Sequence, residues 1–97
     1  MDMVSEEELR NWATVIAAQS RLKLTHFGES PATGPSLARK HIGFENDCRE
    51  YDVWILPELD MIILDVFYKS IETDEQLFRG EINRRSLERI SRLLDQR

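Results

Sequence analysis

Apolar residues recur at helical spacing near the start of the chain, where the stripe consists of Leu9, Trp12, Ala13 and Ile16. Neighbours three or four residues apart lie on one face of an α-helix. Ser5 and Glu8 have the spacing of a capping box, and Val4 with Leu9 fits a hydrophobic staple around it. The pattern predicts a helix from about residue 6 to residue 20.

The strongest β pattern lies in the middle of the chain. Two runs rich in β-branched and aromatic residues, 51–56 and 61–68, flank the turn-like segment 57–60. We expect a hairpin in which Leu56 faces Met61, and this register is an assumption, since a slip of one residue would reassign the cross-strand pairs. In this register one face is continuous and apolar. The other face holds Asp52, Trp54, Leu56, Met61, Ile63, Asp65 and Phe67.

The segment between the first helix and the hairpin has weaker patterns. Residues 22–27 alternate and predict a short strand, and residues 28–35 are rich in glycine, proline and serine, which predicts a loop. Two interpretations stay open after it: a helical turn over 36–41 or an edge strand over 41–44.

Two helical patterns close the chain. Thr73 and Gln76 have capping-box spacing, which predicts a short helix that Gly80 ends. A terminal helix is expected to start at Asn83 or Ser86, with an apolar stripe of Leu87, Ile90, Leu93 and Leu94. The predicted fold is a small two-layer α+β domain, a mainly antiparallel sheet with an N-terminal helix and one or two C-terminal helices.

Composition supports one folded domain over residues 1–97. The chain is 41% hydrophobic and 32% charged, which is typical of a globular protein. Its one cysteine, Cys48, excludes an internal disulfide, so we expect a reducing, cytoplasmic setting. The N-terminus is acidic and has no apolar stretch of the secretory kind, and no run approaches the length of a membrane span.

Charge is distributed unevenly along the chain. Residues 45–75 carry ten acids against two bases, a net charge of −8, whereas residues 76–97 carry six arginines and three acids, a net charge of +3. The acidic middle favours a basic partner or, alternatively, serves solubility. Nucleic acid is not the expected partner, because acids interrupt the arginines of the terminal helix and no aromatic residue lies between them.

Candidate chemistry is sparse. Asp52 and Asp65 face each other in the assumed register, as an acid/base pair or a cation site would require, but the sequence places no third ligand beside them. His26, His41 and Cys48 have no zinc-site spacing, and the glycines form no phosphate-binding loop. We therefore expect neither catalytic residues nor a cofactor nor a metal.

The second hairpin face is the best candidate for function. Residues 28–48, a second copy of the chain or a partner would have to cover its apolar side chains. We hypothesise a non-enzymatic protein-binding module that docks on a basic, nucleic-acid-binding protein surface. The expected contact residues are Asp52, Trp54, Asp65, Phe67, Tyr68, Glu72, Asp74 and Glu75.

Small acidic inhibitors work in this way, among them immunity proteins against nucleases and anti-CRISPR proteins. The chain is similar to them in size, charge and missing chemistry, and it carries no motif of either group. The alternative is a homodimeric accessory or regulatory protein that uses the second hairpin face as its interface.

Overall fold

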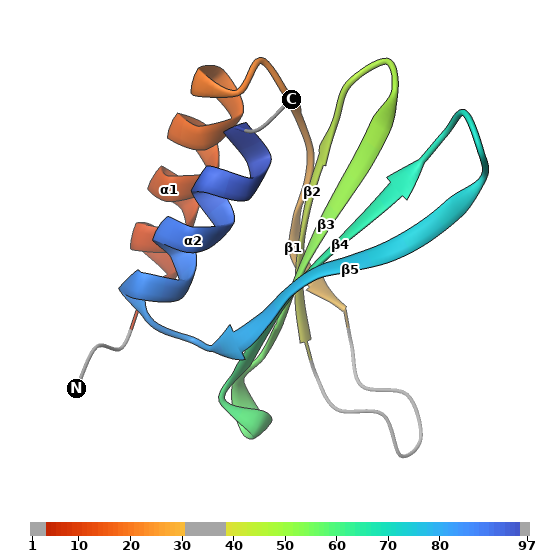
Figure 1. Ribbon diagram of the computed structural model, residues 1–97. Coiled ribbons are helices and arrows are strands. Elements are labelled where there is room, and N and C mark those ends of the chain that lie inside the picture. Colours follow the sequence, from red (N-terminus) through yellow and green to blue (C-terminus); the bar gives the residue numbers. More distant parts are fainter. Residues whose placement is uncertain (1–3, 31–38, 96–97) are drawn as a thin grey trace.

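The computed structural model describes residues 4–30 and 39–95 and shows a small α+β domain (Figure 1). Its elements follow in the order α1 (Glu6–Gln19), β1 (Lys23–Ser30), β2 (Arg39–Glu45), β3 (Arg49–Leu56), the 3-10 turn η1 (Pro57–Leu59), β4 (Met61–Tyr68), β5 (Thr73–Glu81) and α2 (Arg84–Asp95). The predicted fold class is confirmed.

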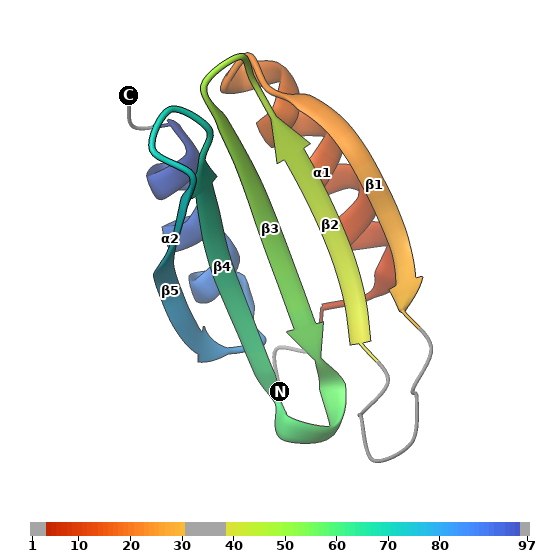
Figure 2. The same ribbon diagram turned by 90° about the vertical axis from the view of Figure 1, so that its right-hand side faces the viewer.

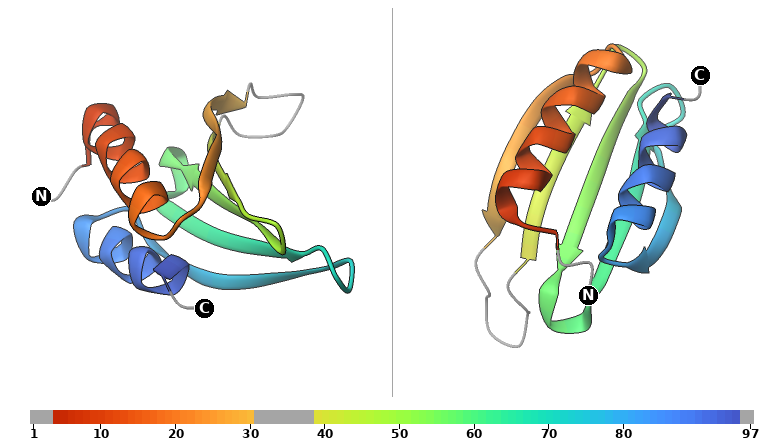
Figure 3. Two further views of the ribbon diagram at one scale, coloured as in Figure 1. Left: turned by 90° about the horizontal axis from the view of Figure 1, so that it is seen from above. Right: turned by 90° about the vertical axis from the view of Figure 1, so that its left-hand side faces the viewer.

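The five strands form one antiparallel meander in the order β1-β2-β3-β4-β5. Both helices lie on the same side of this sheet, as the two views of Figure 3 show. The molecule therefore has two layers, and the other side of the sheet is turned away from the helices (Figure 2). None of the helices in the described ranges is long and apolar enough to cross a membrane.

The expected starts of both helices are confirmed by capping hydrogen bonds at Ser5 and Asn83. The Ser5 hydroxyl accepts a hydrogen bond from the Glu8 backbone N–H at 3.1 Å, and the Asn83 side chain accepts one from the Ser86 N–H at 2.8 Å. The two helices are joined by the Trp12 indole, which donates to the Ser91 hydroxyl at 2.7 Å. The same indole lies edge-on against the ring of Phe44, 6.0 Å away between centroids.

The hairpin register is confirmed, with Leu56 opposite Met61 and Val53 opposite Leu64. Alternate residues of β3 and β4 therefore point into the helix layer, where they are almost fully buried. This core is shared by the helix stripes and the central strands and includes Leu9, Ala13, Ile16, Ile42, Phe44, Val53, Ile62, Leu64, Val66, Leu87 and Ile90.

The prediction for residues 28–48 needs correction. Gly28–Ser30 continue β1 and are not a loop, and the expected edge strand is the interior strand β2, which pairs with β1 on one side and β3 on the other. The backbone of β2 finds hydrogen-bond partners on both β1 and β3. These partners belong to other segments of the chain, so the local sequence pattern of β2 does not show them. The remaining part of the predicted loop and helical turn, 31–38, lies outside the described residues.

The short helix predicted over 73–80 is wrong, because these residues form β5. Local capping-box spacing is outweighed by pairing with β4, which gives the whole length of that strand a second neighbour. The pairing of β4 with β5 shifts by one residue between Leu64 and Asp65, and Leu77 is the extra residue of β5 at this point. Leu77 and Phe78 consequently both pack against the core.

We expect Leu64→Ala to lower the free energy of unfolding by about 2–5 kcal/mol, because it leaves a cavity at a side chain with no exposed surface. Urea unfolding monitored by tryptophan fluorescence measures this change. Leu59→Ala is the matched control, since Leu59 is 52% exposed and its truncation should change the value by less than about 0.5 kcal/mol. Equal losses in the two variants would contradict the described core.

Candidate functional site

The side of the sheet that faces away from the helices, called the open face below, is the candidate site. Within residues 4–30 and 39–95 no element packs on it (Figures 2 and 3). Residues 39–48 lie in β2 and the following turn, so they extend the sheet and do not cover it. Its apolar side chains remain only partly buried, as expected of a face without a covering layer: Trp54, Leu56, Met61, Ile63 and Phe67.

A stack of rings crosses the open face from β1 to β3. The His41 and Trp54 rings lie nearly parallel, 4.1 Å apart between centroids, because these residues are direct neighbours across β2 and β3. The His26 ring follows at 4.9 Å from His41. The Arg39 guanidinium lies 4.5 Å from the Trp54 ring centroid. The Trp54 indole is therefore in contact with both His41 and Arg39 on the open face.

Asp52 and Asp65 face each other across β3 and β4, as the assumed register predicted. The structure supplies a hydrogen-bond partner for one of them, since His41 Nε2 lies 2.6 Å from Asp52 Oδ1. The sequence missed this contact because the strand that carries His41 was ambiguous. The two side chains are 21% and 32% exposed, so the pair is only partly shielded from water.

Among the described residues, the Asp65 carboxylate has no hydrogen-bond partner like the one that His41 provides for Asp52. Burial raises its pKa above the ordinary value of 3.8, and the negative charges of Asp52 and Asp74 raise it further. No described residue donates a hydrogen bond to its carboxylate. The surrounding surface is a shallow depression of about 310 Å³, lined by Asp52, Trp54, Asp65, Asp74, Glu75 and Gln76.

The structure brings most of the predicted contact residues onto one surface. Phe67 lies opposite Asp74 on the open face, beyond the depression. Tyr68 instead packs against the core on the helix side, and its hydroxyl donates a hydrogen bond to Glu75 at 3.2 Å. Glu72 is exposed in the turn between β4 and β5, with a left-handed φ of 49°. Tyr68 and Glu72 therefore lie at the end of the hairpin and do not share the open face with Trp54, whereas Glu75 lines the depression beside it.

Cys48 is exposed in the turn between β2 and β3. No group of three or more histidine, cysteine, aspartate or glutamate side chains in the described part of the chain is arranged to hold a metal ion.

No family model, no curated protein and no solved structure matches the chain. The geometry of the open face therefore carries the functional argument.

We expect Asp65→Asn to stabilise the protein at neutral pH. A raised pKa means that the folded state holds the proton of Asp65 more tightly than the unfolded state, so folding stability falls as pH rises from the ordinary value of 3.8 through the folded-state pKa. The gain of the variant should disappear at about pH 3, where the carboxyl group is protonated in both states.

Urea unfolding of the wild type and variant across this pH range measures the effect. Glu7→Gln is the control, because Glu7 is an exposed side chain on α1. A stability difference between wild type and Asp65→Asn that does not change with pH would contradict this assignment.

Proposed function

We propose that the protein is a non-enzymatic binding module whose open face docks on a basic protein surface. The observation that carries this proposal is a sheet face that no described element covers and that combines an oriented tryptophan with neighbouring carboxylates. Tryptophan is one of the residue types that most often dominate the energy of a protein–protein contact.

The charges of the open face are arranged along the strands. Glu50, Asp52, Asp65 and Asp74 lie toward the end formed by the 46–48 and 69–72 turns. Arg39 and Arg79 lie in the other half, against the Trp54 ring and beside Ile63 respectively. A basic partner is drawn to the acidic half, and its orientation is set by repulsion from the arginines.

Asp65 adds an energetic reason for a cationic partner. In the free protein its ionisation is opposed by burial and by two neighbouring carboxylates. A guanidinium group placed in the depression would relieve this repulsion. If the partner surface is one that normally binds nucleic acid, occupation by this module makes it an inhibitor.

Reversing one charge on the open face tests the proposal. A fluorescent nona-arginine peptide serves as the probe, and stopped-flow mixing measures its association at low and high salt. Asp74→Lys should slow association by about threefold or more at low salt and much less at high salt, because exposed charges act mainly on the encounter rate. Asp74 is exposed, so the substitution leaves the core intact.

Glu7→Lys is the matched control, with the same change of net charge on the helix layer. It should reduce the association rate clearly less than Asp74→Lys. Equal reductions would show that the peptide responds to net charge alone, and this would overturn the open face as the docking surface.

A second copy of the chain is the competing occupant, favoured by the apolar half of the open face, where Trp54, Leu56, Met61 and Ile63 adjoin. A two-fold pairing would also set the acidic half of one copy against Arg39 and Arg79 of the other. Light scattering on a sizing column over a range of concentrations separates the two cases. A monomer at all concentrations is the expected result. A dimer that Trp54→Arg disrupts would show that the open face serves self-association instead.

A further inference from the structure

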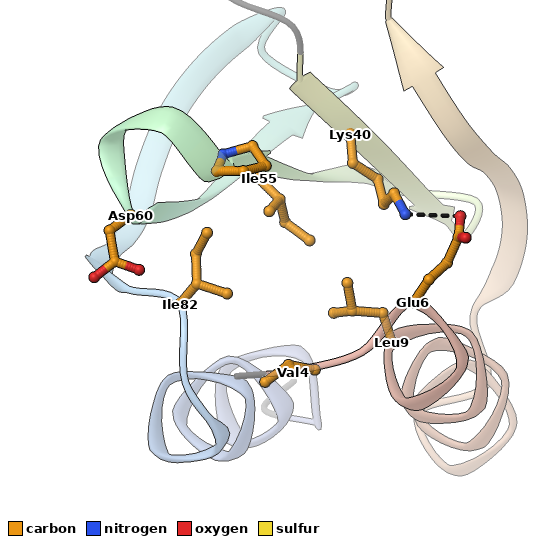
Figure 4. A pocket seen from close by; sticks show the side chains of 8 residues that line it. Val4, Glu6, Leu9, Lys40, Ile55, Asp60 and Ile82 are labelled. Atoms are coloured by element: carbon orange, nitrogen blue, oxygen red, sulfur yellow. Dashed lines mark hydrogen bonds and ion pairs between the residues drawn. The ribbon is translucent and has the colours of Figure 1, made fainter. Parts of the chain in front are cut away.

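A pocket of about 230 Å³ opens on the helix side of the sheet, away from the open face (Figure 4). It lies where the N-terminal end of α1, the turn η1 and the segment between β5 and α2 come together. Its wall is mostly apolar. The residues that line it are Val4, Glu6, Leu9, Lys40, Ile55, Pro57, Asp60 and Ile82.

Lys40 is the unusual member of this wall. It lies opposite Ile55 on the helix-facing side of β2, in the same row as the fully buried Ile42 and Phe44. Its side chain is only 12% exposed, although lysine is rarely so deeply placed without good pairing. The ammonium group forms an ion pair with Glu6 at 2.8 Å and lies 5.4 Å from the Phe27 ring centroid.

The pairing of Lys40 is incomplete. A lysine ammonium group has three N–H donors, and Glu6 is the one hydrogen-bond acceptor that the described residues provide. Glu6 itself is 64% exposed, and its hydrogen bond and charge interaction with Lys40 lower its pKa. The stem of Lys40 is thus largely buried, while its ammonium group forms an exposed hydrogen bond to one solvated carboxylate, which leaves donors available for a second anionic acceptor.

The other rim carboxylate does not complete this pairing. Asp60 lies at the opposite edge of the pocket from Lys40 (Figure 4). The charge that a ligand meets beside the apolar wall is therefore the Lys40–Glu6 pair, with Lys40 as the donor.

We propose that this pocket binds a small carboxylic acid with a short aliphatic tail. The tail lies against Val4, Leu9, Ile55 and Ile82, and the carboxylate accepts a hydrogen bond from Lys40 beside Glu6. The pocket volume limits the size of the ligand. Because a water-sized group takes up about 30 Å³, the pocket holds roughly seven or eight non-hydrogen atoms. A six-carbon acid has this size. The pocket and the open face use different residues, so this site is independent of the proposed function.

Three probes with the same tail separate the apolar contribution from the charged one. Hexanoate, hexanol and hexylamine are titrated at neutral pH into the isotope-labelled protein, and amide chemical shifts of the pocket residues are followed. Hexanoate should bind about tenfold more tightly than hexanol, the size of effect expected for a hydrogen bond to a charged group. Hexylamine should bind most weakly, because its cation meets Lys40.

Two variants test Lys40 as the receptor of the carboxylate. Lys40→Met keeps an apolar side chain and should abolish the preference for hexanoate while hexanol still binds. Glu6→Gln removes the competing carboxylate and should tighten hexanoate binding by at least about threefold. Lys69→Met is the control, because Lys69 also pairs with a glutamate, Glu45, but lies away from the pocket.

The outcomes decide the proposal even if Lys40→Met fails to fold, since Glu6→Gln then carries the test. Equal affinities for hexanoate and hexanol, or weaker hexanoate binding in Glu6→Gln, would overturn the assignment. Changes in amide chemical shift at residues outside the pocket would also overturn the assignment.

Discussion

The pairing of β3 with β4 is the constraint on which the rest of the structure depends. Because side chains alternate along a strand, this one register sends Val53 and Leu64 into the core and Asp52 and Asp65 to the opposite side. A slip of one residue would turn one of the two strands over and bury its aspartate beneath the helices. The apolar stripes of α1 and α2 then cover the buried side, and Trp12 joins the two helices at the centre of this contact.

Two helices cover only one side of a sheet, and the open face is the consequence. An antiparallel sheet tolerates this arrangement when its outer side is polar. Here the outer side instead combines a tryptophan, several aliphatic side chains and a line of carboxylates. Opposed aspartates cost stability, and His41 relieves only Asp52. Sites at which a sequence departs from what is best for stability are often those used for binding.

Alternation along β2 also relates the two candidate sites. Lys40 points into the helix layer and lines the pocket, while its neighbour His41 points to the open face and pairs with Asp52. Adjacent residues of one strand therefore contribute to surfaces on opposite sides of the sheet. Both surfaces use a polar side chain on β2, and in both the polar group is stacked on or close to an aromatic ring.

The sequence by itself determined the features that short-range physics controls. Helical spacing and capping residues located α1 and α2, and the alternation of the hairpin located β3, β4 and their register, which placed Trp54, Asp52 and Asp65 together on one face. The tertiary structure decided the rest. Residues 73–81 became a strand because β4 offered them a pairing edge, residues 39–45 became an interior strand because both neighbours pair with them, and the contacts of His41 and Lys40 followed from that placement. Such contacts join residues distant in the chain, so their energy is absent from any local pattern and is gained only when the whole sheet forms.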